Sequence, residues 1–273
     1  MSAVSCRVGA LTVLSLRDGA VAATPAQFFP AVSPAAWTAD ETAYLRADGR
    51  FAMNLGCFLV HEGESWTLVD TGNGTRPGSY GGKLLNELQA EGVAPEQIAC
   101  VIITHLHADH AGGNTVDRDG AAVPLFPNAR HVVQRRDWEA RAEHARDFPD
   151  LDRCLDPIAE AGLLELIDGD AAVTAAISVL LTPGHTPGHQ CVLLASGDEK
   201  AMIIGDLAHT PVQLNHPDWP LAAELEPAQA ARSRAAVFDR VEGEGLLLCA
   251  GHFPHPSMGN VIRVAGRRRW QSL

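Results

Sequence analysis

Three histidines and one aspartate stand within six positions of the chain, directly after an apolar run. They are His105, His107, Asp109 and His110, and they follow the segment Val-Ile-Ile-Thr that ends at residue 104. A single histidine on a half-buried strand is usually a packed core residue, but four side chains of metal-ligand type followed by two glycines are hard to explain by packing. Imidazole and carboxylate groups are common ligands of divalent metals. This segment therefore predicts a metal site where a strand leaves its sheet.

Four more apolar runs end in side chains of the same types. Asp70 follows Leu-Val, His185 and His189 lie in Thr-Pro-Gly-His-Thr-Pro-Gly-His, Asp206 follows Ile-Ile-Gly, and His252 follows Leu-Cys-Ala-Gly. Loops at strand ends have rigid neighbours, which is what a preorganised metal site requires. Each short pattern is a weak signal by itself. In this order after the histidine-rich segment, they together strongly indicate one shared site.

Two successive stretches of alternating strands and helices must position these loops. Apolar runs and periodicity predict strands over residues 10–16, 54–60, 66–70, 176–181, 190–195, 201–204 and 245–250. Helices are predicted over residues 82–92, 136–146 and 227–241, the first of them ending at Gly92. The alternation favours an α/β sandwich with the sheets inside and the helices outside. Because no linker divides residues 1–273, we expect one domain, with residues 22–50 as an irregular arm near the active site.

The composition excludes several classes of protein. The formal net charge of −12 repels phosphate backbones, so a nucleic-acid partner is not expected. No apolar run reaches the roughly 18 residues that cross a bilayer, and the first residues do not resemble a secretion signal. The six cysteines form no Cys-x-x-Cys pair, which indicates reduced thiols and a cytoplasmic protein. The basic run at residues 267–269 is interpreted as a solvated strand end.

With these motifs in this order, the chain resembles the metallo-β-lactamase-fold hydrolases from about residue 54 to residue 256. The pattern is most similar to the methyl parathion hydrolase and acyl-homoserine lactonase branch. It shares Val-Asp-Thr-Gly at residues 69–72, Gly-Asp-Leu-Ala-His at 205–209 and Gly-His-Phe-Pro-His-Pro at 251–256. The resemblance implies a four-layer αββα sandwich and, as in related enzymes, a homodimer.

The resemblance also implies a binuclear metal centre with seven ligands. One ion would be bound by His105, His107 and His185, the other by Asp109, His110 and His252, and Asp206 would bridge the two. Asp70 resembles the aspartate that orients the metal loop, and His189 resembles a supporting residue. Five neutral imidazoles and two carboxylates leave two divalent cations with a net positive charge, which favours a bridging hydroxide at neutral pH. Zn²⁺ is the first expectation, and Mn²⁺, Fe²⁺ or Co²⁺ would suit the same donors.

His209 departs from the lactonase pattern, which has a tyrosine at this position. We expect His209 to act with Asp109 as a catalytic group by donating a hydrogen bond to the developing anion or the leaving group. A packing role for His209 stays open. An aromatic substrate pocket is expected from the residues Phe28, Phe29, Trp37, Trp219 and Phe253, with the loop 210–220 in contact with the substrate.

The function expected from the resemblance is hydrolysis of a small ester-like substrate: a lactone, an aryl ester or a phosphotriester. Alternatives within the same fold are a β-lactamase, a thioesterase-type hydrolase and a mononuclear iron persulfide dioxygenase. A non-catalytic binding protein is a more remote alternative, because the ligand set is complete.

Overall fold

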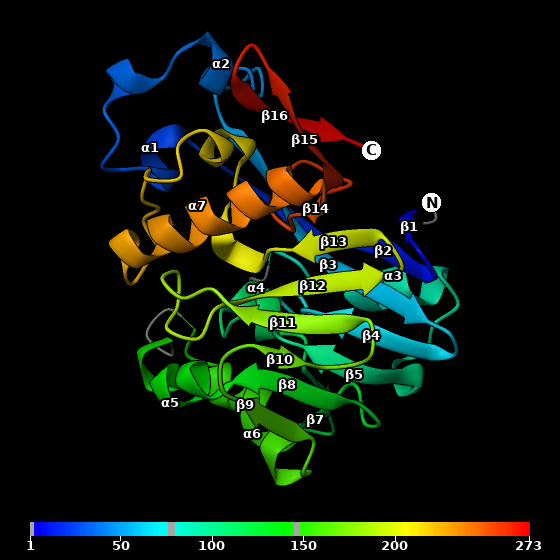
Figure 1. Cartoon of the computed structure of the whole chain (residues 1–273). Helices are drawn as coiled ribbons and strands as arrows, with labels where there is room; N and C mark the ends of the chain where they lie inside the picture. The colour runs from blue at the N-terminus through cyan, green and yellow to red at the C-terminus, as the bar shows by residue number, and fades with distance from the viewer. Residues whose placement is uncertain (1–2, 76–79, 145–147) are drawn as a thin grey trace.

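Two sheets lie face to face in the computed structural model, which describes residues 3–75, 80–144 and 148–273 (Figure 1). In these residues the first sheet has the order β1-β2-β3-β4-β5-β8-β9. Its strands are β1 Val4–Val8, β2 Leu11–Ala23, β3 Phe51–Glu62, β4 Ser65–Val69, β5 Ile98–Ile102, β8 Arg130–Gln134 and β9 Leu164–Ile167. The pairs β4·β5, β5·β8 and β8·β9 are parallel.

The second sheet runs in chain order from β10 to β16. Its strands are β10 Ala171–Ala172, β11 Ile177–Leu181, β12 Gln190–Ser196, β13 Glu199–Ile203, β14 Leu247–Cys249, β15 Met258–Val264 and β16 Arg267–Ser272. A small separate hairpin is made by β6 Thr115–Arg118 and β7 Ala121–Pro124. The expected strands are all present, whereas β1, β6, β7, β9, β10, β15 and β16 were not individually predicted.

The helices are α1 Pro25–Phe28, α2 Ala39–Thr42, α3 Leu84–Ala90, α4 Ala108–Ala111, α5 Arg135–His144, α6 Leu151–Glu160 and α7 Pro227–Glu244, with 3-10 turns η1 Pro34–Ala36, η2 Pro95–Gln97, η3 Gly205–Leu207 and η4 Pro211–Leu214. Helices α3, α6 and α7 cover the outer faces of the two sheets, and the shorter helices α1, α2 and α4 lie in the arm and the loops. The last two residues of the helix predicted over 136–146 lie outside the described residues. Among the described residues, no helix is both long and apolar enough to span a bilayer.

Three apolar clusters show why the layers stack in this way. The cluster between the sheets contains Phe58 and Val60 from the first sheet and Val192 and Ile203 from the second. A second cluster places Leu84 and Leu88 of α3 and Leu151 and Leu155 of α6 against the outer face of the first sheet. In the third, Val237, Phe238 and Val241 of α7 pack on the second sheet. The predicted αββα sandwich is therefore confirmed.

The arm between β2 and β3 is a short-helix segment built around aromatic side chains. Thr24 and Thr38 cap α1 and α2 through capping boxes with Gln27 and Glu41. Phe29 and Phe51 are buried in a cluster with Val212 and Leu221, against which Phe28, Val32, Trp37, Tyr44, Leu45 and Trp219 pack. The arm thus packs against the chain that follows η3.

The basic run at residues 267–269 begins strand β16 and keeps the side chains of Arg267 and Arg269 partly exposed, as expected for a strand end, but it also contacts the arm. Arg267 pairs with Glu41, and Arg269 lies 2.6 Å from Asp40. Arg268 lies 3.0 Å from Glu242 of α7. Strand β16 places these arginines beside the arm, as Figure 1 shows for α2, and the acidic residues of α2 and α7 provide partners that the local sequence does not reveal.

Glu41 should link the stability of the arm to pH. Its carboxylate is 3% exposed, and the hydrogen bonds from Thr38 and His216 outweigh its burial and lower its pKa to about 2. A folded-state pKa below the ordinary value of 4.5 contributes stability that is complete above about pH 4.5 and is lost as pH falls towards 2. We therefore expect Glu41→Gln to lower the free energy of unfolding at pH 7 and to reduce its loss between pH 5 and pH 3.

Urea titrations of the two proteins at each pH would measure this difference. Glu160→Gln, at an exposed position of α6, is the matched control. Parallel stability curves for wild type and Glu41→Gln would show that the Glu41 carboxylate carries no such linkage.

Candidate metal centre

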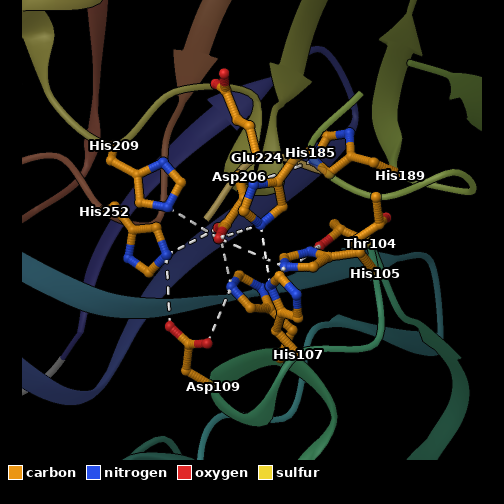
Figure 2. Close-up of polar contacts among 12 residues, drawn as sticks. Thr104, His105, His107, Asp109, His185, His189, Asp206, His209, Glu224 and His252 are labelled. Atoms are coloured by element: carbon orange, nitrogen blue, oxygen red, sulfur yellow. Dashed lines mark hydrogen bonds and ion pairs between the residues drawn. The ribbon is translucent and has the colours of Figure 1, made fainter. Parts of the chain in front are cut away.

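The predicted ligands lie on four segments at one edge of the sandwich. His105 and His107 follow β5, and α4 then carries Asp109 and His110. His185 lies between β11 and β12, Asp206 in η3 after β13, and His252 after β14. Figure 2 shows the side chains of His105, His107, Asp109, His185 and His252 pointing toward one another around Asp206. The hydrophobic interior of the strands thus fixes loops that are up to 147 positions apart in the chain, from residue 105 to residue 252.

The two oxygens of Asp206 face two different groups of side chains. Its Oδ2 lies 3.4 Å from His105 Nε2 and 3.1 Å from His185 Nε2, and both of these nitrogens lie 3.0 Å from His107 Nδ1. Its Oδ1 lies 2.9 Å from His110 Nε2 and 2.8 Å from His252 Nε2. The structure therefore brings together the two predicted ligand groups, with one carboxylate between them.

Asp109 completes the second group. Its Oδ1 lies 3.6 Å from His110 Nε2, and its Oδ2 lies 3.5 Å from His252 Nε2. The ligand atoms of Asp109, His110 and His252 all lie within 4.8 Å of one another, as do those of His105, His107, His185 and Asp206. Asp109 has a side chain that is 22% exposed, whereas that of Asp206 is 4% exposed.

Several buried nitrogen and oxygen atoms of the cluster converge without hydrogen bonds to the described part of the chain, as metal ligands would. His110 Nε2, His252 Nε2 and Asp206 Oδ1 are buried and form no hydrogen bond with any described residue, although they lie close together. Buried polar groups of this kind ordinarily have partners. Imidazole and carboxylate donors converging in two groups suit two divalent cations. The residues present fit the binuclear centre that the resemblance implies.

The charges divide the histidines of the metal-free cluster. Burial opposes protonation of His110 and His252, but the carboxylates beside them outweigh it and raise their pKa values, so both imidazoles release a proton when a metal binds. Burial opposes ionisation of Asp206, but the surrounding histidines His110, His252 and His209 outweigh it and hold the pKa of the carboxyl well below its ordinary value. Burial lowers the pKa of His105 far below its usual range, so this imidazole is neutral. Neutral imidazole and ionised carboxylate are the forms that bind metals.

Asp70 orients His110 and the loop that carries it. Its Oδ2 lies 2.8 Å from His110 Nδ1 and accepts a hydrogen bond from Thr104 Oγ1, and its Oδ1 accepts one from Thr104 N at 2.8 Å. Asp70 has a φ of 64°, a left-handed conformation that aspartate and asparagine tolerate better than most residues. This backbone turn at the end of β4 directs the carboxylate towards β5.

Replacement of Asp70 by asparagine should weaken the metal centre without changing its shape. Asparagine tolerates the same φ but lacks the negative charge that supports His110, and loss of such a partner typically costs about 10- to 100-fold in metal affinity or activity. We expect a decrease of that size in metal affinity, measured by competition with a chelator. Asp119→Asn is the matched control, because Asp119 is exposed and also has a positive φ, of 54°. Equal affinity in all three proteins would contradict this role.

Other residues hold the ligand loops in ways that the sequence analysis did not specify. His189 Nε2 accepts a hydrogen bond from Asp206 N at 3.1 Å, and burial lowers the pKa of His189 to about 3, so it supports Asp206 as a neutral imidazole. Asp137 at the start of α5 accepts hydrogen bonds from Leu106 N and Thr186 Oγ1, which joins two ligand loops. Asn54 O lies 2.8 Å from His252 Nδ1.

No pattern in the neighbouring sequence identifies Asp137 or Asn54 as a supporting residue. Asp137 follows a strand at a helix start, which is a position where acidic residues are common for helix stability alone. Asn54 acts through its backbone oxygen, which every residue has. Only His189 stood out in the sequence, through the repeated Thr-Pro-Gly-His.

His209 faces the same carboxylate from the cavity side. Its Nε2 lies 3.0 Å from Asp206 Oδ2, its ring stacks on that of His252 with centroids 4.8 Å apart, and its residue exposure is 7%. Burial lowers the pKa of His209 to about 4. The structure thus places a neutral imidazole with one ring nitrogen directed at the ligand cluster.

A cavity of about 410 Å³ opens over the cluster. Its wall includes His107, Asp109, His185, Asp206, His209 and His252, together with the apolar side chains of Phe28, Met53, Phe148, Leu221 and Leu225. A mostly apolar wall with a few convergent polar groups is typical of a small-molecule site.

The five aromatic residues expected around the pocket have different positions in the structure. Phe28 lines the cavity. Phe29, Trp37 and Trp219 pack behind it in the aromatic cluster of the arm, and Phe253 lies in the core against Trp270, with ring centroids 5.1 Å apart. The expectation that these four side chains line the pocket is therefore corrected. They pack against apolar partners in the arm and the second sheet and do not line this cavity. The wall expected from loop 210–220 comes instead from the residues just after it, 221–225.

Comparison with known proteins gives consistent results. Residues 57–252 match the model of the metallo-beta-lactamase superfamily. An N-acyl homoserine lactonase from a Bacillus species is 34% identical over 157 residues, which span 50% of this chain and 57% of that protein. An N-acyl homoserine lactonase from Bacillus thuringiensis is 29% identical over 216 residues, covering 72% of this chain and 80% of that protein.

Solved structures resemble the whole described fold. The structure of AidC, a dizinc quorum-quenching lactonase with a bound product, has a TM-score of 0.87 and 26% identity, and covers 100% of this chain and 97% of that one. The hydrolase AbOPH has a TM-score of 0.87 and 25% identity, with 100% and 98% covered.

Proposed function

Because the chain belongs to the metallo-beta-lactamase superfamily, we propose that it is a binuclear metal-dependent hydrolase that opens N-acyl homoserine lactones. The observation that carries this proposal is the position of Asp206, whose two oxygens face two separate ligand groups. Curated relatives and a structural neighbour named as lactonases support the substrate class. The cavity supports it as well, because its apolar wall is suited to an acyl chain and its polar floor to a lactone ring.

His105, His107 and His185 would hold one ion, Asp109, His110 and His252 the other, and Asp206 both. A pair of divalent cations in such a site supplies Lewis acidity and makes water more acidic. Phe28, Met53 and Leu221 give one side of the cavity an apolar lining suited to the acyl chain. In lactone hydrolysis, water adds to the carbonyl carbon, the ring C–O bond breaks, and a proton must reach the departing oxygen.

Two side chains are positioned to stabilise the negative charge that develops in this reaction and to move the proton. His209 Nε2 points to the region where the reacting oxygen would lie, so a proton on this nitrogen would stabilise developing negative charge. Asp109 has the more exposed of the two ligand-cluster carboxylates and lines the cavity. We assign Asp109 the transfer of the proton released by the attacking water to the leaving oxygen.

A side-by-side rate measurement tests the proposed function. Purified protein reconstituted with Zn²⁺, Mn²⁺ or Co²⁺ would be assayed with N-hexanoyl homoserine lactone, an aryl ester, a phosphotriester and a cephalosporin. We expect the lactone to have the highest kcat/KM and the metal content to reach two ions per chain. A background rate with the lactone at full metal loading would reject the lactonase assignment. The rates with the other three substrates would then show which class of substrate the protein hydrolyses.

We further propose that the bound ions are zinc, that the 273 residues form one domain, and that the enzyme works as a cytoplasmic homodimer. Elemental analysis of protein purified without added metal tests the first of these. Gel filtration with light scattering tests the dimer, for which a monomeric mass would be contrary evidence.

A further inference from the structure

A buried arginine joins three segments beside the candidate metal centre. Arg234 of α7 is 1% exposed, and its Nε donates a hydrogen bond to Leu207 O at 2.6 Å. Its Nη1 donates one to Pro217 O at 2.5 Å, and its Nη2 pairs with the buried carboxylate of Glu224. One guanidinium thus contacts the residue that follows Asp206, the loop after η4 and the segment before α7.

The segment from Leu221 to Leu225 forms one wall of the cavity. Leu221, Ala222, Ala223 and Leu225 line it, whereas Figure 2 shows the Glu224 side chain turned away from the ligand cluster. The backbone of this wall is tied to the first ligand group, because Leu225 N donates to His185 O at 3.2 Å and Glu226 N to Gly184 O at 2.9 Å.

The same wall also contacts the arm. Ala222 N donates a hydrogen bond to Phe28 O at 3.0 Å, and Leu221 packs in the aromatic cluster with Phe29 and Phe51. The side chains of Ala222 and Leu225 reach solvent, so their packing alone does not fix the wall. Glu224 is the charged anchor within this segment, with its carboxylate fully inside the protein.

A buried ion pair is a costly means of stabilising a fold, since well-packed apolar side chains of equal volume often serve as well. The planar guanidinium offers several donors in fixed directions. Here they reach the carbonyl oxygens of Leu207, Pro217 and Trp219 and a carboxylate, which lie on different segments. An apolar replacement would leave the carbonyls of Leu207 and Pro217 and the Glu224 carboxylate without these donors. Arg234 therefore fixes the position of these segments relative to one another.

We propose that Arg234 is a positioning residue that, through Glu224 and Leu207, holds the wall formed by residues 221–225 in register with Asp206 and His185 and thereby sets affinity for the acyl part of the substrate. This inference rests on the proposed lactonase function for its substrate, but the contacts themselves are independent of it. Among the described residues, Arg234 neither lines the 410 Å³ cavity nor donates a hydrogen bond to a side chain of the ligand cluster. Its effect is therefore transmitted through the wall.

The test compares Arg234→Met and Arg234→Lys with Arg240→Met. Arg240 lies on the same helix, is 35% exposed and pairs with Glu244 at 2.8 Å, so it serves as the matched control. For N-hexanoyl homoserine lactone we expect Arg234→Met to raise KM about tenfold or more, with a smaller change in kcat and an unchanged metal content. Arg234→Lys keeps the charge and should recover part of the affinity, whereas Arg240→Met should match wild type.

Hydrogen exchange gives a second readout that needs no catalytic activity. The amides of Leu225 and Glu226 should exchange faster in Arg234→Met than in Arg240→Met, because the wall loses its anchor. If Arg234→Met does not fold, Glu224→Gln, which keeps size and hydrogen-bonding atoms, carries both measurements. A lower Tm with unchanged KM and unchanged exchange would overturn the proposal and leave Arg234 a purely stabilising residue. If wild type itself has no lactonase activity, the proposed function fails, while the exchange result still decides the positioning role.

Discussion

Replacing Asp206 by asparagine is expected to lower kcat/KM for lactone hydrolysis by at least about 10³-fold, because one charge serves both halves of the ligand cluster. Asparagine preserves the size of the side chain and one oxygen. However, five histidine nitrogens lie between 2.8 and 3.4 Å from the Asp206 oxygens, and the amide group can no longer offer two equivalent anionic donors. The bound metal should fall below two ions per chain, as measured by elemental analysis.

The control for this substitution is Asp198→Asn, at an exposed turn between β12 and β13. Its activity and metal content should equal those of wild type. An Asp206→Asn protein that bound two ions and kept wild-type turnover would show that Asp206 does not bridge the centre, and the assignment of the two ligand groups would need to be revised.

The second large effect is expected at His209. Removal of one donor aimed at a developing negative charge commonly costs about 10²- to 10³-fold in kcat, and we expect a loss in this range for His209→Ala, with both ions retained. His209→Tyr should restore part of the activity, because the phenol can donate a hydrogen bond from the same position. Steady-state kinetics together with elemental analysis measure both quantities.

His61→Ala, at the opposite end of β3 from the site, controls for the loss of a histidine. Unchanged kcat in His209→Ala with full metal content would remove His209 from the reaction and favour a packing role against His252. Loss of one ion would instead identify His209 as a ligand, which its position beside Asp206 and His252 makes chemically reasonable.

The ligand groups were accessible from sequence because each follows an apolar run, and such runs become strands whose ends meet at one edge. In this way His105 and His252 could be placed at strand ends without knowledge of the order of the strands in the sheets. The layers were accessible because strands and helices alternate in two successive halves of the chain, and the resemblance then implied the αββα order. The resemblance then supplied the two ligand sets, which residue types alone did not divide.

Contacts between distant segments were not accessible. Arg267 was interpreted as solvated because neither Glu41 nor the path of the arm is visible from residues near the C-terminal run. Phe253 was expected in the pocket because it follows a ligand, but the side chain points into the second sheet and packs on Trp270. Arg234 was an ordinary helix residue in the sequence, and only the fold shows which carbonyl oxygens surround it.

Strand β16 ties the arm through Arg267 and Arg269, and the arm contributes Phe28 to the cavity. Laboratory evolution of substrate preference should therefore recover beneficial changes in the C-terminal hairpin as well as around the opening of the cavity. For the same reason, an affinity tag fused directly after β16 is a poor choice for kinetic work, because strain on that hairpin would reach the side of the cavity that Phe28 lines.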